Sequence, residues 1–157
     1  MLIHLWLNDR ELTKEIDADL MLLDFLRDNR CYSVKRGCDT ANCGLCTVLV
    51  DNMVVLACST LTARVDGKQV VTLEGLKPEA LELAAFLAAE GADQCGFCNP
   101  GLMVTIIGMT RELENPDDAA IREYLAGNLC RCSGYASHLR GIKAYLVHLQ
   151  SQGGMSK

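Results

Sequence analysis

Apolar residues in the first half of the chain come in short runs separated by turn residues, a pattern typical of β-strands. The stretch 20–29 differs, because its apolar positions 22, 23, 25 and 26 fall on one side of a helix. Asp51-Asn52 is a favourable two-residue hairpin turn, and Asn8-Asp9-Arg10 marks an earlier one. We therefore expect a small α+β unit with one helix and strands at 2–7, 12–16, 47–50, 53–58 and 70–73.

The pattern changes at Gly75-Leu76-Lys77-Pro78, after which longer stretches rich in Ala, Leu and Glu predict helices. Proline near a first turn marks three of the starts, at Pro78, Pro100 and Pro116. At one of these we expect Asn99 as the N-cap with Pro100 at the first helical position. The expected helices are 78–90, 99–114, 115–126 and 136–150. Four consecutive helices predict a compact bundle, so we place one domain at 1–76 and a second at 77–157.

Composition and charge narrow the class of protein. Half of the residues are hydrophobic and 22% are charged, as in globular domains. The net charge is −5 without a basic run, so we expect no nucleic-acid partner. The apolar runs are too short to span a bilayer, and the N-terminus lacks the features of an export signal. A cytoplasmic protein without membrane contact is the expectation.

Nine cysteines are the most informative feature of the composition. A reducing cytosol keeps thiols free, so metal or cluster ligation is favoured over disulfides. Nine is an odd number, which predicts two sets of four and one remaining thiol. We expect Cys31 to be that remaining thiol, a small buried hydrophobe.

The first set of cysteines has the C-x4-C-x2-C spacing of plant-type ferredoxins, in Cys38, Cys43 and Cys46. If Asp51-Asn52 is the hairpin turn, residue 46 faces residue 57, and Cys58 returns beside Cys46. These four thiolates could hold a [2Fe–2S] cluster. Buried free thiols and a zinc site are the alternatives, but zinc sites usually pair two C-x2-C knuckles and this set has one.

The second set combines Cys95 and Cys98, just before an expected helix, with Cys130 and Cys132 between the last two helices. Amide groups at the N-terminus of that helix could stabilise an anionic cluster. Two such pairs can meet at one end of a helical bundle. Taken alone, this set fits a cluster, a zinc site or, less well, a thioredoxin-like redox pair.

With both sets of cysteines considered, the chain resembles the small iron–sulfur subunit of the xanthine dehydrogenase family of molybdenum hydroxylases. The motifs that carry the resemblance occur in the family's order across nearly the whole chain. They are Lys35-Arg36-Gly37-Cys38, Cys43-Gly44-Leu45-Cys46-Thr47, Gln94-Cys95-Gly96-Phe97-Cys98-Asn99-Pro100-Gly101 and Gly127-Asn128-Leu129-Cys130-Arg131-Cys132-Ser133-Gly134-Tyr135. The resemblance favours a cluster over zinc at the second set.

The resemblance implies an N-terminal β-grasp ferredoxin-like domain and a C-terminal four-helix bundle domain, each with one [2Fe–2S] cluster. It also implies a large subunit that binds the molybdopterin cofactor and carries out the hydroxylation, and a further subunit that binds FAD. The subunits would form a heterotrimer that pairs into a dimer of trimers. Electrons would pass from molybdenum through the second set, with Gln94 and the backbone of Cys132 near the pterin, and then through the first set to FAD or another acceptor.

The chain itself would be a redox subunit without catalytic residues of its own, since it has no Ser/His/Asp set or phosphate loop. A structural zinc-binding module and a stand-alone ferredoxin are the alternatives. The substrate pocket belongs to the partner, and relatives handle aldehydes, aromatic acyl-CoA esters and carbon monoxide. A purine or another N-heterocycle is the first expectation.

Four residues depart from the common family pattern: Ala41, Leu45, Asn99 and Ser133. If the backbone at residue 41 needs a positive φ, alanine there costs about 1 kcal/mol. Asn99 should cap a helix as well as the more common threonine does. The three histidines, His4, His138 and His148, are expected at the surface or at an interface, away from both sets of cysteines.

Overall fold

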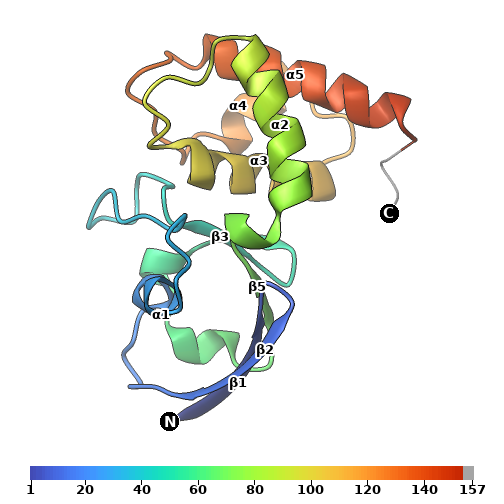
Figure 1. Cartoon of the computed structure of the whole chain (residues 1–157). Helices are drawn as coiled ribbons and strands as arrows, with labels where there is room; N and C mark the ends of the chain where they lie inside the picture. Colours follow the sequence, from blue (N-terminus) through green and yellow to red (C-terminus); the bar gives the residue numbers. More distant parts are fainter. Residues whose placement is uncertain (154–157) are drawn as a thin grey trace.

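The computed structural model describes residues 1–153 and is of the mixed α+β class that the sequence predicts. Within these residues, five strands form one sheet with the order β2-β1-β5-β3-β4. Figure 1 places this sheet and helix α1 on one side of the molecule and helices α2 to α5 on the other. The strands are β1 Leu2–Leu7, β2 Arg10–Glu15, β3 Thr47–Val50, β4 Met53–Leu56 and β5 Gln69–Val71. The helices are α1 Leu22–Asp28, α2 Lys77–Ala89, α3 Asn99–Glu112, α4 Asp118–Tyr124 and α5 Ala136–Ser151.

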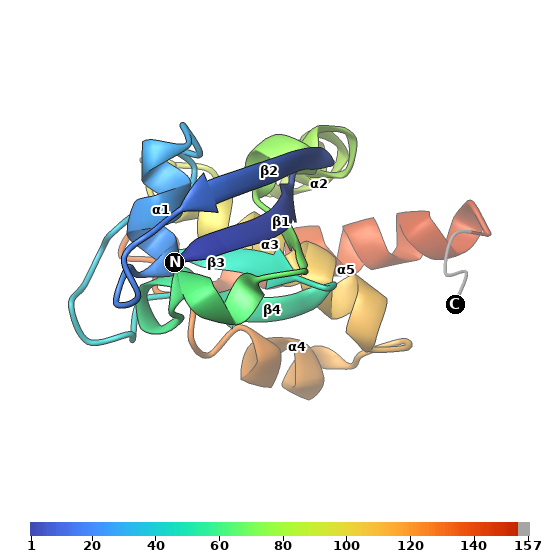
Figure 2. The same cartoon turned by 90° about the horizontal axis from the view of Figure 1, so that it is seen from below.

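Two tight hairpins fix the register of the sheet, whose strands are seen from below in Figure 2. Asn8 and Asp9 have φ values of +50° and +64°, and Asp51 and Asn52 have +49° and +66°. Such a pair of positive values is what two-residue hairpins of type I′ require. The first turn is shorter than predicted, because strand β2 already begins at Arg10.

The second hairpin has the predicted register, with Val50 opposite Met53 and Thr47 opposite Leu56. This pairing continues one residue further, where the Ala57 N–H donates to the Cys46 carbonyl at 3.2 Å. Strand β4 ends earlier than predicted, and a short 3₁₀ helix, Ala57–Ser59, carries Cys58. The expected proximity of Cys46 and Cys58 follows from this register.

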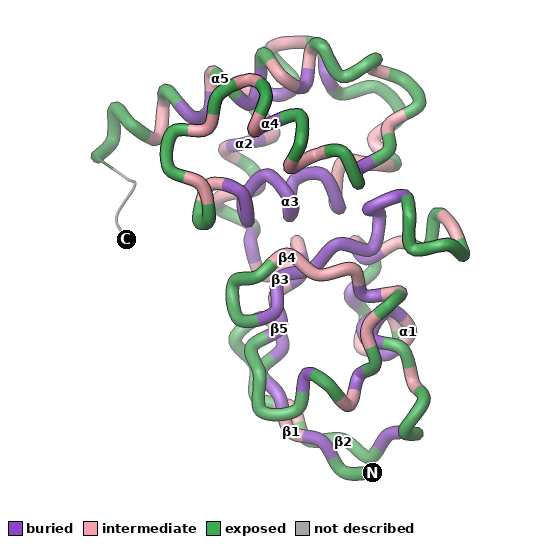
Figure 3. Tube along the Cα trace, turned by 180° about the vertical axis from the view of Figure 1, so that it is seen from behind, coloured by how far each residue is buried: buried purple, intermediate pink, exposed green. Residues whose placement is uncertain are grey.

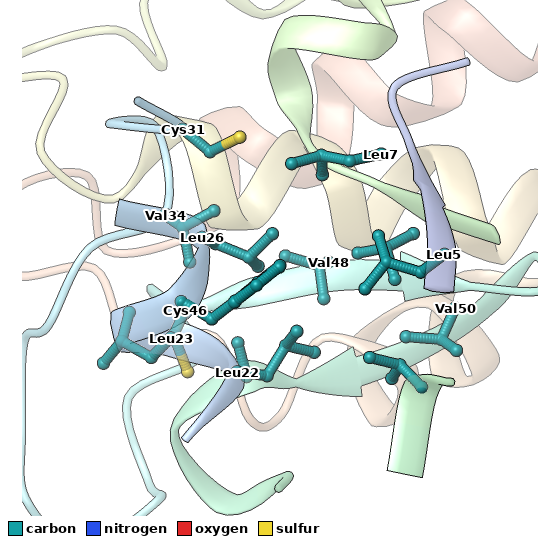
Figure 4. Packing of buried hydrophobic residues seen from close by; sticks show 14 of the residues in the cluster. Leu5, Leu7, Leu22, Leu23, Leu26, Cys31, Val34, Cys46, Val48 and Val50 are labelled. Atoms are coloured by element: carbon teal, nitrogen blue, oxygen red, sulfur yellow. The ribbon is translucent and has the colours of Figure 1, made fainter. Parts of the chain in front are cut away.

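Helix α1 covers one face of the sheet and encloses the first hydrophobic core. Its apolar side chains Leu22, Leu23 and Leu26 belong to one buried cluster with Leu5 and other strand residues (Figure 4). Alternate residues of a strand point to opposite faces, so Val48 and Val50 of β3 join the same core. Cys31 and Cys46 are also part of this cluster. The prediction that Cys31 is a buried apolar thiol is confirmed, since only 3% of its surface is exposed.

Helix α3 lies against the other face of the sheet and is buried along most of its length (Figure 3). Leu49, between Val48 and Val50 on β3, belongs to this second core. The helix comes very close to the strands at Gly108, where an added Cβ would lie 2.3 Å from Val54 Cγ2. Strand β3 is therefore buried on both faces, and α3 connects the sheet to the remaining helices.

The start of α3 corrects one sequence prediction. Its N-cap is Cys98, and Asn99 is already the first helical residue. The Asn99 side chain does not cap the helix; its Nδ2 donates to Asp93 Oδ1 at 2.9 Å. The reason is local: the Cys95–Cys98 loop enters the helix in a helical conformation, with Cys98 at φ −81° and ψ −19°.

The described part of the chain contains no helix that is both long and apolar enough to cross a membrane.

Candidate metal centres

The first set of cysteines lies at the end of the sheet next to helix α3. Cys43 and Cys46 are buried, and Cys38 and Cys58 are half-buried. Cys38 contacts Cys43, and Cys46 contacts Cys58. The loop also directs amide groups at sulfur, since the Asn42 N–H donates to Cys38 Sγ at 3.3 Å. The structure thus brings together the four predicted residues of this set.

The pKa values of two thiols in this set are shifted in opposite directions. Backbone N–H groups, first that of Asn42 and then that of Thr40, lower the pKa of Cys38 to about 6. Burial, followed by the neighbouring Cys46 thiol, raises the pKa of Cys58 to about 11. Amide donors favour a thiolate, whereas burial beside other sulfurs opposes one.

The loop between Cys38 and Cys46 requires an unusual backbone. Ala41 has a φ of +52°, so alanine occupies a left-handed conformation there. Gly37 leaves room for sulfur, because a Cβ at this position would lie 3.1 Å from Cys43 Sγ and 2.8 Å from Leu45 Cδ2. Bulkier residues at Gly37 would displace the side chains that shape the loop.

The second set lies where the loop before α3 meets the loop before α5. Cys95 Sγ and Cys132 Sγ are 3.6 Å apart. The Sγ atoms of Cys98 and Cys130 lie within 4.8 Å of each other and of a ring nitrogen of His138. The structure thus also brings together the four predicted residues of this set.

The second set again contains thiols with opposite shifts. Burial, and then the neighbouring Cys130, raises the pKa of Cys98 to about 12. Burial alone would raise the pKa of Cys130, but hydrogen bonds from the Ser133 hydroxyl and from nearby backbone amides lower it. Cys130 is the better thiolate of this pair.

The chemistry of both donor sets fits a thiolate-ligated metal group. Crowded thiolates repel one another, so neighbouring thiols resist joint ionisation unless a cation lies between them. The nine cysteines form no disulfide in the structure. Cysteine sulfur is the ligand for iron–sulfur clusters and for structural zinc.

The two cysteine loops touch each other directly. The Leu129 N–H donates to the Cys43 carbonyl at 2.9 Å, so a residue next to Cys130 is bonded to a cysteine of the first set. Asn128, which is buried, donates through Nδ2 to the Gly44 carbonyl at 3.3 Å. The two sets of cysteines are therefore held in a fixed relation by the backbone of their own loops.

Glycine permits this close contact. Gly44 has a φ of +71°, and a Cβ there would lie 2.4 Å from the Gly127 carbonyl oxygen. On helix α3, a Cβ at Gly101 would lie 2.3 Å from the Gly44 carbonyl oxygen. Neither distance is possible between real atoms, so both positions require glycine.

Comparison with known proteins identifies this arrangement. Residues 6–71 match the 2Fe-2S iron-sulfur cluster binding domain, and residues 72–143 match the [2Fe-2S] binding domain. The chain is also 44% identical over 118 residues to the "Xanthine dehydrogenase iron-sulfur-binding subunit" of Escherichia coli, and the alignment covers 73% of this chain and 74% of the relative. The chain belongs to the iron–sulfur subunits of the molybdenum hydroxylase family.

Further similarities agree with this iron–sulfur subunit family. The "Nicotine 6-hydroxylase small subunit" of Paenarthrobacter nicotinovorans is 36% identical over 142 residues, covering 89% of this chain and 86% of the relative. In the crystal structure of quinoline 2-oxidoreductase from Pseudomonas putida 86, one chain superposes with a TM-score of 0.87 and 31% identity. That superposition covers 99% of this chain and 98% of the other. The iron–sulfur subunit is thus an electron-transfer component of an oxidoreductase, as predicted.

Two residues predicted to lie near a partner's cofactor are neighbours in the iron–sulfur subunit. Gln94 Nε2 donates to the carbonyl oxygen of Cys132 at 3.4 Å, and both residues are exposed. Arg36, next to the loop of Cys38, pairs with Asp24 at 2.6 Å on the protein surface.

The histidine prediction is wrong at one position. His4 lies beside Glu11 and His148 beside Glu82, both partly exposed, as expected. His138 instead is 2% exposed and lies next to Cys98 and Cys130. Spacing along the chain carries no signal for this contact, because His138 is on helix α5 and reaches the cysteines only through the turn that precedes it.

Proposed function

We propose that each set of four cysteines holds one [2Fe–2S] cluster. The first would be held by Cys38, Cys43, Cys46 and Cys58, and the second by Cys95, Cys98, Cys130 and Cys132. When bound, each cluster supplies a site that carries one electron at a time. The observation that carries this proposal is the convergence of four thiols at each of two places, in a chain whose two halves match the two [2Fe-2S] domain families.

The protein's own residues prepare these two places in different ways. At the first, the backbone N–H of Asn42 points at Cys38 Sγ, and donors of this kind stabilise the negative charge on sulfur. At the second, Cys98 is the N-cap of helix α3. The positive end of the helix dipole therefore lies beside the sulfurs of this set.

We propose that the domains divide at 76/77, directly before helix α2. The N-terminal part would be a β-grasp ferredoxin-like domain, with α1 packed on the sheet. The C-terminal part would be a four-helix domain, supported by the packing of α2 on α3 and α5 and of α4 on α5.

The same proposal includes partners. A large subunit would carry the molybdopterin cofactor, and Gln94 and Cys132 would lie nearest to it; an FAD-binding subunit would lie nearer the first set. Exposed apolar side chains around the second set support a docked protein there, since Phe97 is 52% and Leu129 49% exposed. We propose a cytoplasmic heterotrimer that pairs into a dimer of trimers.

The substrate would be bound by the large subunit. We propose an N-heterocycle, because relatives of this chain are named for xanthine, nicotine and quinoline. The iron–sulfur subunit would relay the electrons removed from that substrate to the flavin.

Low-temperature EPR of the dithionite-reduced protein tests this function, together with iron, sulfide and zinc analysis of the same sample. We expect two S = ½ signals and about four irons per chain, the sum of two [2Fe–2S] centres. A colourless, EPR-silent protein that contains zinc would overturn the proposal.

A further inference from the structure

The Ser133 hydroxyl lies at the centre of a small hydrogen-bond network beside the second set of cysteines. Its Oγ is 3.3 Å from Cys130 Sγ and 2.8 Å from His138 Nδ1. It also accepts a hydrogen bond from the Tyr135 N–H at 3.1 Å. Three neighbours therefore share one hydroxyl group.

The number of hydrogens and lone pairs on the Ser133 hydroxyl determines which neighbour donates to it and which accepts from it. A hydroxyl has one hydrogen to donate and two lone pairs that accept. The Tyr135 N–H occupies one lone pair, which leaves one lone pair and one hydrogen for His138 and Cys130. A metal-bound thiolate can only accept, so the hydrogen goes to Cys130 and the remaining lone pair accepts from His138.

This direction fixes the tautomer of His138. The proton must be on Nδ1, where it donates to Ser133, and Nε2 is left without a proton. Within residues 1–153, Nε2 has no hydrogen-bond partner, and no fully buried polar side-chain atom is unpaired. His138 also lines a cavity of about 450 Å³ together with residues of helix α4.

Tyr135, in the same turn, holds the backbone of Cys130 in place. Tyr135 has a φ of +67°, and its hydroxyl accepts a hydrogen bond from the Cys130 N–H at 2.8 Å. The turn therefore fixes the cysteine at its amide while the hydroxyl of Ser133 reaches its sulfur. His138 completes the arrangement, because its Nδ1–H occupies the second lone pair of Ser133 and leaves the hydroxyl hydrogen only one acceptor, the sulfur.

We propose that His138 is a positioning residue for the second cluster, one that directs the hydrogen of Ser133 to Cys130 Sγ. This inference rests on the proposed function, since it concerns a cluster held by Cys130. A hydrogen bond to a ligand sulfur stabilises the reduced, more negative state and so raises the reduction potential. His138 thus makes the second cluster a better electron acceptor than it would be without an oriented donor.

Redox titration followed by EPR tests the proposal on the cluster-containing protein. We expect Ser133→Ala to lower the ratio of reduced to oxidised second cluster about tenfold at a fixed potential, equal to 59 mV for a one-electron couple. His138→Leu should shift it in the same direction by less, because the hydroxyl remains but is no longer oriented. His138→Asn, which can keep a donor near the Nδ1 position, should stay close to the wild type.

Combining Ser133→Ala with His138→Leu tests whether His138 acts by orienting the Ser133 hydroxyl. The alternative is that loss of the polar imidazole ring shifts the potential by itself. If His138 acts through Ser133, His138→Leu should cause no further shift once Ser133 is alanine. An equal shift in both backgrounds would overturn the proposal. Loss of the second signal in His138→Leu but not in Ser133→Ala would also overturn it, and would make His138 a ligand.

Two controls are built into the same chain. The first cluster's signal should keep its potential in every variant. His148→Leu removes another α5 histidine, which lies ten residues further along the helix, about 15 Å away at 1.5 Å per residue. It should leave both potentials unchanged. Absence of any iron–sulfur signal in the wild type would instead contradict the proposed function itself, so the two failures are distinguishable.

Discussion

At the scale of single residues, Ala41 has a backbone conformation that is unfavourable for a residue with a Cβ. Its φ of +52° brings the Cβ of an L-residue into conflict with the following carbonyl oxygen. The loop nevertheless adopts this conformation between Cys38 and Cys43, whose thiols contact each other. The sequence identified the position, and the structure shows that its φ is positive.

Ala41→Gly should therefore stabilise the protein. We expect a gain of about 1 kcal/mol in the free energy of unfolding, reduced in part by the greater freedom of glycine in the unfolded chain. Urea unfolding followed by circular dichroism measures it. The control is Ala85→Gly at an exposed position inside α2, which should lose about 1 kcal/mol. Equal losses in both variants would contradict the strain at residue 41.

Cysteine replacement tests the division of the nine thiols at the same scale. Cys43→Ser should remove one EPR signal and leave the other, because the cysteine that Cys43 contacts, Cys38, belongs to the first set. Cys31→Ala should change neither signal, since Cys31 is packed in the hydrophobic core. If Cys31→Ala abolished a signal, the assignment of ligands would be wrong; if Cys43→Ser abolished both, the two sites would not be separate.

At the scale of elements, Glu74 connects the loop that follows α1 with the segment that follows β5. Its carboxylate accepts from the Ser33 N–H at 2.9 Å and from the Thr72 hydroxyl at 2.6 Å. Burial opposes its ionisation, but the hydrogen bonds from Ser33 and Thr72 outweigh burial and lower its pKa. Glu74 thus fixes the loop after α1 against the segment after β5.

The pH dependence of this contact has a definite sign. Because the folded pKa of Glu74 is below the ordinary 4.5, its stabilisation is complete above pH 4.5 and is lost as the pH falls through the folded pKa. We expect Glu74→Gln to cost about 1–2 kcal/mol at pH 7, since hydrogen bonds to charged groups are the stronger ones. Urea unfolding at pH 7 and well below pH 4.5 should show that difference shrink. The exposed Glu123→Gln is the control, and a difference that persists unchanged at low pH would refute the role of the charge.

At the scale of the whole molecule, the contact between the two cysteine loops joins the sheet half to the helical half. Gly101 of helix α3 lies against the loop of the first set of cysteines. Gly44 of that loop in turn lies against Gly127 and Asn128, just before Cys130. The contact is made largely by backbone atoms, including the hydrogen bond from Leu129 to Cys43. Such contacts tolerate no extra atoms, because nearby backbone cannot move as a flexible side chain does.

Gly101→Ala should separate these loops. We expect a loss of about 1–3 kcal/mol in the free energy of unfolding from overpacking, although alanine is otherwise the better helix former. Thermal unfolding and the EPR line shapes of both clusters measure the effect. Gly127→Ala is the matched control, since a Cβ there has no neighbour within 4 Å. Equal behaviour of the two variants would show that the contact is not tight.

Much of this protein was predictable from the sequence alone. Apolar periodicity and turn residues predicted each α-helix and strand of residues 1–153 to within a few residues, but not the short 3₁₀ helices, because the signals of the longer elements are local in the chain. The spacing of the cysteines predicted two sets of four thiols. The Asp51-Asn52 turn predicted that Cys58 lies beside Cys46. The motifs around the cysteines identified the family.

The tertiary structure decided what depends on contacts between distant segments. Cys98 replaced Asn99 as the N-cap because the preceding loop enters the helix directly. His138 reached Cys130 because a left-handed turn at Tyr135 folds helix α5 back over the cysteine loop. Gly44 of the sheet half and Gly101 of the helical half lie in close contact. Local propensity determines which element a segment forms, whereas packing in three dimensions determines which side chains touch, and that second choice has no local signal in the sequence.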